Sequence, residues 1–182
     1  MNNPLIHDQK QMLHAALSGF DGARQRLLAA SQPGAAPPHV FAPLTETLWW
    51  TVSADDSFEE LTDTRVITYW RSRADYRQAR NADESGRVLA GLRYARDRCG
   101  HQLALIALED GLRLPFALPN ATGQAFRWRP SAQLPQPRSN SRRAQAERMR
   151  PGYDTWLAGR PAAMTVESAA NWFAHAASEA GI

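Results

Sequence analysis

The segment from Asn81 to Leu108 constrains the fold more than any other, because its apolar side chains recur with the period of an α-helix. One helical stripe, at successive spacings of three and four residues, consists of Leu89, Leu92, Arg96, Cys99, Leu103 and Ile106. Asp83 and Ser85 both suit the N-cap position ahead of this stripe. The segment is therefore predicted to be a helix with an arginine inside its apolar stripe.

Three other segments carry helical patterns. Residues 4–31 begin with Pro4, which suits a first helical turn, and are followed by a Pro- and Gly-rich connector over residues 32–43. Residues 43–62 form either one helix that buries Trp49 and Trp50 or two pieces divided by a loop at residues 53–57. A last helix is expected to start near Thr165, after a break at residues 159–161. Residues 66–80 fit a helix or a strand.

Residues 109–152 have a different character, because turn residues alternate there with short apolar segments. A small β-hairpin is predicted from the apolar residues Leu112, Leu114, Phe116, Phe126 and Trp128. The arginine-rich stretch that follows, residues 138–152, is expected to be a solvated loop or a mobile helix. We therefore predict a single all-α domain over residues 1–182, a bundle of four to five helices with an irregular or β-hairpin insertion at residues 109–152.

The charge of the chain is mildly basic, with a net charge of +3 and a pI near 9.5. Twenty of the twenty-one basic residues are arginine and only Lys10 is lysine. A GC-rich genome favours arginine codons, and phosphate recognition also favours arginine because the guanidinium binds phosphate through two parallel hydrogen bonds. The composition permits a polyanionic partner such as RNA without requiring one.

Cysteine and hydropathy limit the classes of protein to consider. The single cysteine, Cys99, excludes an internal disulfide and a cysteine-based metal site. The sequence has no apolar run of signal-peptide length and no window of the ~20 apolar residues that span a bilayer, so a cytoplasmic protein without a membrane partner is expected. Neither a glycine-rich phosphate loop nor a His-x-x-x-His pair is present, so no metal and no cofactor are expected.

Arg96 and His101 form an Arg-x4-His pair on the predicted helix. The spacing alone says little, because a chain with twenty arginines and five histidines holds roughly 0.5 such pairs by chance. The position of Arg96 says more, since a guanidinium buried without partners would cost several kcal/mol. His101 lies ~140° around the helix from Arg96, so the two share a site only if the helix bends at Gly100 or if a second protomer contributes across a two-fold axis.

The run LRYARDRCGHQ, residues 92–102, resembles the signature helix of the HEPN superfamily, the nucleotide-binding domain of higher eukaryotes and prokaryotes. Arg96, Asp97 and His101 match that signature, with Asp97 where asparagine is commoner, and the resemblance covers about a dozen residues. It implies a HEPN-like helical bundle that forms a homodimer, with two motifs facing one cleft. Many HEPN proteins are metal-independent endoribonucleases that act as toxins or in phage defence, some with a cognate antitoxin, and others are inactive.

The three motif residues suit this chemistry. His101, with a pKa near neutrality, would take the proton of a ribose 2′-OH that attacks the neighbouring phosphodiester, and a second histidine would protonate the leaving 5′-oxygen. Arg96 would stabilise the charge of the phosphorane, and Asp97 would orient a histidine or arginine. The alternative is a helix with a solvated Arg96, a hydrogen-bonded His101 and an exposed Asp97 that pairs with Arg93 or Arg98.

Other arginines are candidates for RNA binding. Arg93, Arg98, Arg127 and Arg129 could contact phosphates, as could Arg142, Arg143, Arg148 and Arg150, and Trp128 could stack on an unpaired base. The alternative is a solvated arginine face and an ordinary hairpin tryptophan. Trp49 and Trp50 could form an aromatic wall, although adjacent helical tryptophans point ~100° apart and one is normally in the core.

Two functions therefore remain open at this point. The first is a HEPN-like endoribonuclease that uses Arg96, Asp97 and His101. The second is a helical protein that binds RNA or a protein partner without catalysis and without dependence on His101. An enzyme acting on a small molecule has no residue evidence in this sequence.

Overall fold

The computed structural model describes residues 4–31, 37–102, 126–134 and 140–182, and the side chains of residues 8–31, 39–98, 126–134, 144 and 146–182. These residues form six α-helices and one short 3-10 helix: α1 (Pro4–Ala30), α2 (Pro37–Asp63), α3 (Arg73–Ala82), α4 (Val88–Gln102), η1 (Ser131–Gln133), α5 (Asn140–Trp156) and α6 (Ala162–Ala180). The all-α prediction is confirmed. The number of helices is larger than the predicted four or five.

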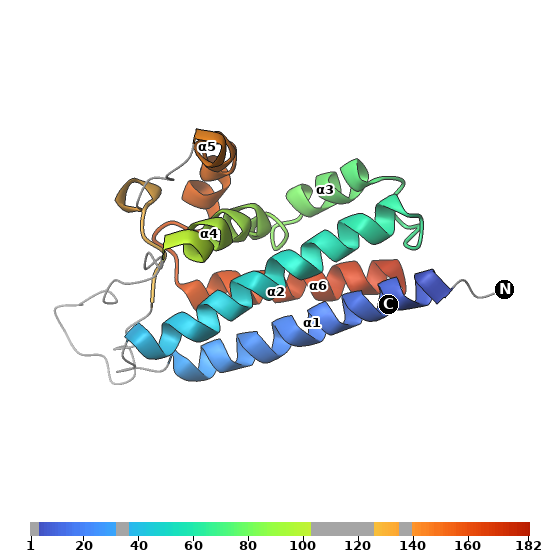
Figure 1. Cartoon of the computed structure of the whole chain (residues 1–182), viewed down its shortest axis with the longest axis horizontal. Coiled ribbons are helices and arrows are strands. Elements are labelled where there is room, and N and C mark those ends of the chain that lie inside the picture. Colours follow the sequence, from blue (N-terminus) through green and yellow to red (C-terminus); the bar gives the residue numbers. More distant parts are fainter. Residues whose placement is uncertain (1–3, 32–36, 103–125, 135–139) are drawn as a thin grey trace.

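Helices α1 and α2 are the longest and lie side by side, with α6 along the same direction and α3, α4 and α5 above α2 (Figure 1). Aromatic side chains join these layers. The Phe173 ring of α6 meets Phe20 of α1 edge to face at 5.1 Å and stacks on Phe58 of α2 at 6.2 Å. Phe58 also stacks on Tyr76 of α3 at 5.8 Å. One apolar core therefore holds α1, α2, α3 and α6 together.

Helix α2 is continuous, so the single-helix alternative for residues 43–62 is confirmed, although Trp49 is exposed and not buried. The loop alternative at residues 53–57 is wrong, as is a connector that extends to residue 43. The hydroxyls of Ser53 and Ser57 donate to the carbonyls four residues before them, at 3.1 and 2.8 Å, and thus accommodate serine inside the helix. Pro43 lies within the second turn, where it has no N–H to donate, so α2 continues through it with the loss of one helical hydrogen bond. The buried residues on either side of the serines, such as Val52 and Phe58, outweigh their preference for a loop.

The connection before α3 contains turns and bends, so the strand alternative for residues 66–72 is wrong. The Ser72 hydroxyl accepts from the Asp75 N–H at 3.2 Å and caps α3. Asp83 caps the turn that leads into α4, because its carboxylate accepts from the N–H groups of Ser85 and Gly86 and its carbonyl accepts from the Arg87 N–H at 3.1 Å, although α4 itself begins only at Val88. Gly86 is required there, since a Cβ would lie 2.2 Å from the Arg80 carbonyl oxygen.

Helix α5 crosses α4 at two glycines. A Cβ on Gly91 would lie 2.4 Å from Leu157 Cδ1 and 3.2 Å from Tyr153 Cα, and a Cβ on Gly152 would lie 3.0 Å from Ala90 Cβ. This close approach explains why residues 140–152, expected to be a solvated loop or a mobile helix, adopt the helical alternative: α5 packs its Tyr153 ring against Tyr94 at 4.9 Å. The tertiary contact stabilises a segment whose own sequence is polar.

Only the second half of the predicted hairpin, with Phe126 and Trp128, lies among the described residues. Leu112, Leu114 and Phe116 lie outside the described residues. The segment around Trp128 instead pairs with the chain before α6, through an isolated antiparallel bridge between Arg127 and Pro161. Within the part of the chain that the structure describes, no helix is long and apolar enough to cross a membrane.

Candidate functional site

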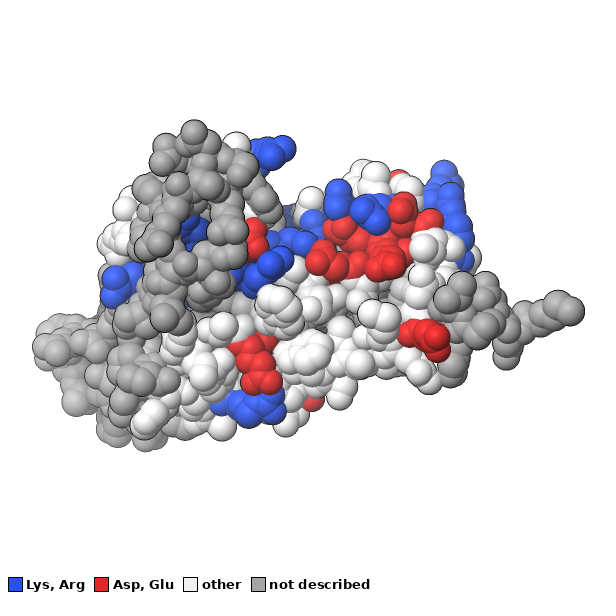
Figure 2. All heavy atoms as spheres, viewed as in Figure 1, with Lys and Arg blue, Asp and Glu red and all other residues white. Residues whose placement is uncertain are grey.

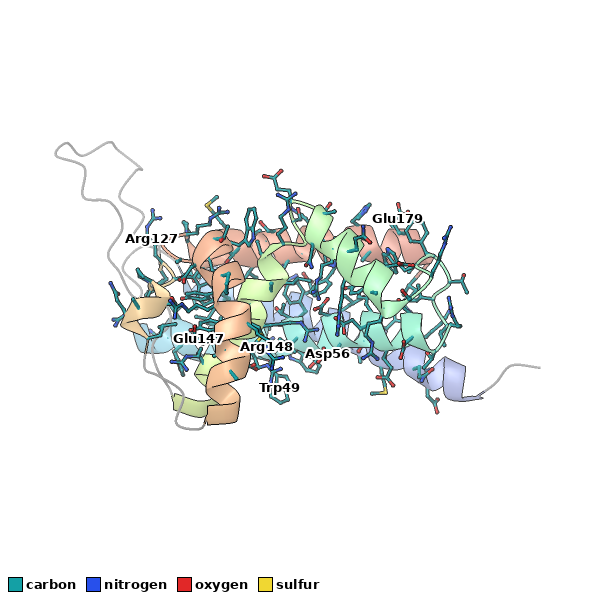
Figure 3. All side chains as sticks on the ribbon, turned by 90° about the horizontal axis from the view of Figure 1, so that it is seen from above. Trp49, Asp56, Arg127, Glu147, Arg148 and Glu179 are labelled. Carbon is teal, nitrogen blue, oxygen red and sulfur yellow. The ribbon has the colours of Figure 1, made fainter. Side chains whose placement is uncertain are left out.

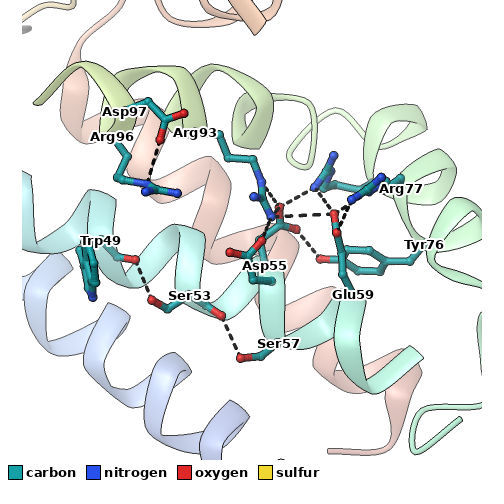
Figure 4. A network of polar contacts seen from close by, with 12 residues as sticks. Trp49, Ser53, Asp55, Ser57, Glu59, Tyr76, Arg77, Arg93, Arg96 and Asp97 are labelled. Atoms are coloured by element: carbon teal, nitrogen blue, oxygen red, sulfur yellow. Dashed lines mark hydrogen bonds and ion pairs between the residues drawn. The ribbon is translucent and has the colours of Figure 1, made fainter. Parts of the chain in front are cut away.

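Arg96 and Asp97 lie at neighbouring positions on α4, and the Arg96 Nε is 3.3 Å from an Asp97 carboxylate oxygen (Figure 4). Their side chains are 33% and 27% exposed. The Arg96 Nε is itself buried and makes no hydrogen bond with the described residues, and the guanidinium carbon lies 5.9 Å from the centre of the Trp49 ring on α2. Arg96 is thus half-buried at the junction of α2 and α4, between a carboxylate and an indole.

His101 belongs to the last turn of α4, five residues after Arg96. Its side chain lies outside the described ones, as do those of Cys99 and Gln102. The prediction that Arg96, Asp97 and His101 share one helix is confirmed, while the meeting of the Arg96 and His101 side chains stays a prediction. Arg93 and Arg98, the alternative partners for Asp97, are directed toward other groups.

Arg93 extends from α4 to the carboxylates of α2, with its Nε 2.7 Å from Asp55 and an Nη 2.6 Å from Asp56. Burial alone would lower the pKa of Arg93, but the charges and hydrogen bonds of Asp55 and Asp56 raise it above its ordinary value. The guanidinium is thus committed to protein carboxylates. The role of Arg93 in RNA binding stays a prediction.

A buried ionic network surrounds Asp55, which has no exposed side-chain surface. Besides Arg93, Asp55 accepts hydrogen bonds from the Tyr76 hydroxyl at 2.8 Å and from Arg80. One turn later on α2, Glu59 accepts two bonds from Arg77, at 2.8 and 2.5 Å. Figure 2 shows an acidic patch bordered by basic residues on the surface near this network, over α2 and α3.

The electrostatics of this network shift the pKa values of Glu59 and Tyr76. Burial would raise the pKa of Glu59, but the hydrogen bond from Arg77 and the charges of Arg93, Arg77 and Arg80 hold it below its ordinary value. Burial and the negative charge of Asp55 raise the pKa of Tyr76 well above its ordinary value. The Trp172 indole of α6 donates to the Tyr76 oxygen at 3.2 Å, so the network joins four helices. Its carboxylates are all paired with arginine, which indicates a structural role.

This network was not predicted from the sequence. A signal was present, because Asp55 and Glu59 are four residues apart on α2 and Arg77 and Arg80 are three apart on α3. Each pair therefore lies on one helical face. Only the packing of α3 and α4 on α2 makes these faces meet.

The other predicted RNA contacts divide into buried and exposed residues. Arg98 is 6% exposed, and its guanidinium lies 5.9 Å from the Tyr94 ring. Trp128 is 1% exposed, and its indole N–H donates to the Thr165 hydroxyl at 2.8 Å. In this structure neither side chain is exposed toward solvent, where a base or a phosphate would approach. The roles of Arg98 and Trp128 in RNA binding stay predictions.

Of the four other candidate arginines whose side chains the structure describes, three have hydrogen bonds or ion pairs within the chain. Arg127 donates to the Gly159 carbonyl at 2.8 Å, and the Arg129 Nε is buried without a hydrogen bond to the described residues. On α5, Arg148 is exposed and donates to its own helix, and Arg150 pairs with Glu147 and Asp154. Arg142 and Arg143 have side chains outside the described ones. The roles of Arg127 and Arg129 in RNA binding stay predictions.

A shallow apolar groove of about 490 Å³ lies on α2 beside Arg96, lined by Phe41, Ala42, Thr45, Glu46, Trp49 and Trp50. The two tryptophans differ, as adjacent helical positions require. Trp50 packs on α1 so closely that a Cβ on Gly19 would meet its ring at 2.6 Å. Trp49 is 60% exposed and projects from the bundle (Figure 3). The groove therefore places an exposed aromatic surface next to the motif arginine.

The comparisons with known proteins identify no relative of this chain. No family model, no curated protein and no solved structure matches this chain. Among the described residues, no group of three or more histidine, cysteine, aspartate or glutamate side chains is arranged to hold a metal ion.

Proposed function

We propose that this protein is a metal-independent, HEPN-like endoribonuclease that acts as a homodimer, in the role of a toxin or phage-defence effector with a possible antitoxin partner. The observation that carries the proposal is the position of Arg96. Of the three arginines on α4, Arg93 is bound to Asp55 and Asp56 and Arg98 is buried, whereas a third of the Arg96 side chain is exposed. Arg96 is thus the α4 guanidinium that an RNA phosphate can reach.

The proposed reaction uses two copies of the motif. The His101 imidazole takes the proton of a ribose 2′-OH, and the 2′-oxygen forms a bond to the adjacent phosphorus. The bond from phosphorus to the 5′-oxygen breaks, and the protonated imidazole of a second protomer's His101 gives its proton to that oxygen. Arg96 stabilises the added negative charge of the phosphorane. The products are a 2′,3′-cyclic phosphate and a free 5′-hydroxyl.

Asp97 is assigned a positioning role in this reaction. Its carboxylate lies 3.3 Å from the Arg96 Nε, so it orients the guanidinium through that edge. Asp97→Asn would keep the side-chain shape and remove the charge. In this reaction, the Asn variant would retain more cleavage than Asp97→Ala.

Cleavage of single-stranded RNA in EDTA tests the proposal. The wild-type protein should produce 2′,3′-cyclic phosphate ends, and His101→Ala should lower the rate about 10²- to 10⁴-fold, the usual contribution of a general acid or base. His175→Ala is the matched control, because His175 is an exposed histidine on α6. Equal cleavage by wild type and His101→Ala, or cleavage lost only when metal is removed, would contradict the proposal.

The exposed Trp49 and its groove favour a second candidate, a protein that binds RNA or a protein partner without cleaving RNA. The same assay separates the two candidates. This second function predicts no cleavage by the wild type and binding that His101→Ala leaves unchanged.

A further inference from the structure

We infer that the groove on α2 holds an unpaired base of single-stranded RNA, stacked on Trp49, while Arg96 binds the adjacent phosphate. This inference rests on the proposed function and identifies Trp49 as the residue that positions the substrate. Neither the motif nor the resemblance that it carries includes Trp49.

The exposure of Trp49 is the first support. The neighbouring apolar residues of α2, Leu48 and Val52, are at most 4% exposed, whereas Trp49 is 60% exposed. Scattered apolar residues are common on protein surfaces, but Trp49 is continuous with an apolar groove that also contains Phe41 and Trp50. An exposed indole at the edge of a groove is a stacking platform for a planar ring.

The distance to Arg96 is the second support, and it selects the occupant. The Arg96 guanidinium lies 5.9 Å from the Trp49 ring centre, so an apolar surface and a positive charge are next to each other. A nucleotide presents a planar base and an anionic phosphate with the same proximity. An apolar peptide or an apolar face of a second copy would fill the groove but would offer no anion to Arg96.

The polar residues of the groove determine how the base is read. The Thr45 hydroxyl donates to the Phe41 carbonyl at 2.9 Å, and the Glu46 carboxylate pairs with Arg26 of α1 at 2.5 Å. Both groups already have partners within the protein. Recognition therefore depends on stacking more than on hydrogen bonds to base edges, which predicts a preference for single strands and a weak preference among bases.

Binding of a 2′-O-methyl RNA oligonucleotide tests the inference, because this probe lacks the attacking hydroxyl and is not cleaved. Fluorescence anisotropy of a labelled single-stranded eight-nucleotide probe would give the Kd for each full-length variant. Trp49→Ala should weaken binding about 5- to 150-fold, the equivalent of ~1–3 kcal/mol of stacking, and Trp49→Phe should retain most of the affinity. Met12→Ala, at a 67% exposed position on α1, is the matched control and should bind as wild type does.

A second probe places the base itself on Trp49. In a set of probes with one abasic position each, at least one should bind wild type more weakly than the complete probe does, and Trp49→Ala should not distinguish the two. If, for every abasic probe, the loss of affinity caused by the missing base and the loss caused by Trp49→Ala were additive, this result would overturn the inference. So would a Trp49→Ala variant that binds all probes normally but dissociates to monomers in light scattering, since Trp49 would then belong to a protein interface.

The outcomes for the inference and for the proposed function are distinguishable. Cleavage of unmodified RNA together with a Kd that is insensitive to Trp49 would contradict the inference and leave the endoribonuclease proposal standing. Trp49-dependent binding without any cleavage would support the base site and contradict the endoribonuclease. No binding of the probes together with no cleavage of unmodified RNA would overturn both.

Discussion

The Arg93 guanidinium of α4 lies 2.7 Å from the Asp55 carboxylate of α2, and this pair joins positions 38 residues apart in the chain. One turn later on α4, Arg96 lies next to Trp49, which precedes Asp55 on α2. The two contacts therefore set the register of an antiparallel pair of helices. The buried pair positions the exposed one, because α4 cannot slide along α2 without separating Arg93 from Asp55.

Loss of the Asp55 charge should destabilise the fold strongly. Asp55→Asn leaves Arg80 and Arg93 without their shared carboxylate in a buried site, and we expect the free energy of unfolding to fall by ~3–5 kcal/mol. Asp56→Asn is the matched control, because Asp56 is 56% exposed and its loss should change stability by less than ~1 kcal/mol. Urea denaturation of both variants measures the difference, and equal effects would contradict a structural role for the network.

Acid should weaken the fold through Glu59. The folded protein holds the pKa of Glu59 below its ordinary value of 4.5, so the unfolded chain binds the proton first as the pH falls. The stabilisation is present above pH 4.5 and is lost as the pH falls from there through the lower folded-state pKa. The slope of unfolding free energy against pH in this acid range should be smaller in Glu59→Gln than in wild type. The same slope in both proteins would show that other carboxylates cause the acid sensitivity.

Two glycines of α1 should respond in opposite ways to alanine. A Cβ on Gly19 would meet the Trp50 ring at 2.6 Å, so Gly19→Ala should destabilise the protein by ~1–3 kcal/mol. A Cβ on Gly22 would meet only the flexible Arg26 side chain, 3.4 Å away at the nearest, so Gly22→Ala should stabilise it by ~0.5–1 kcal/mol through the lower entropy of the unfolded chain. Thermal denaturation of the two variants checks both signs. A Gly19→Ala protein as stable as wild type would show that Trp50 can move away.

Trp128 should affect stability and not RNA affinity. Trp128→Phe removes the indole donor to Thr165 and leaves a gap in a buried site, with an expected loss of ~1–3 kcal/mol in unfolding free energy. Its Kd for the 2′-O-methyl probe should equal that of wild type below the denaturation temperature. Weaker binding with unchanged stability would support Trp128 as a contact for a base.

Local pattern was sufficient to predict much of the helical structure. The helix predicted over residues 4–31 is α1, Pro4–Ala30, and the helix expected near Thr165 is α6, which begins at Ala162 after the predicted break. In both, the apolar residues recur at helical spacing and proline stands at or next to the first residue, so the signal lies within a few residues of the element it specifies. The chain alone also identified Arg96 as an arginine that needs partners.

Only the tertiary structure decided which of these side chains remain exposed. The helical pattern distinguishes only Arg96 among the three arginines of α4, yet in the structure Arg93 binds Asp55, Arg96 lies beside an exposed Trp49 and Arg98 is buried. Likewise Trp49 is exposed and Trp128 is buried. The physical reason is that burial and ion pairing depend on partners from distant segments: α2 supplies the carboxylates that bind Arg93, and Thr165 at the start of α6 binds Trp128. Helical periodicity specifies a face of each helix, and the packing of the six helices determines what that face meets.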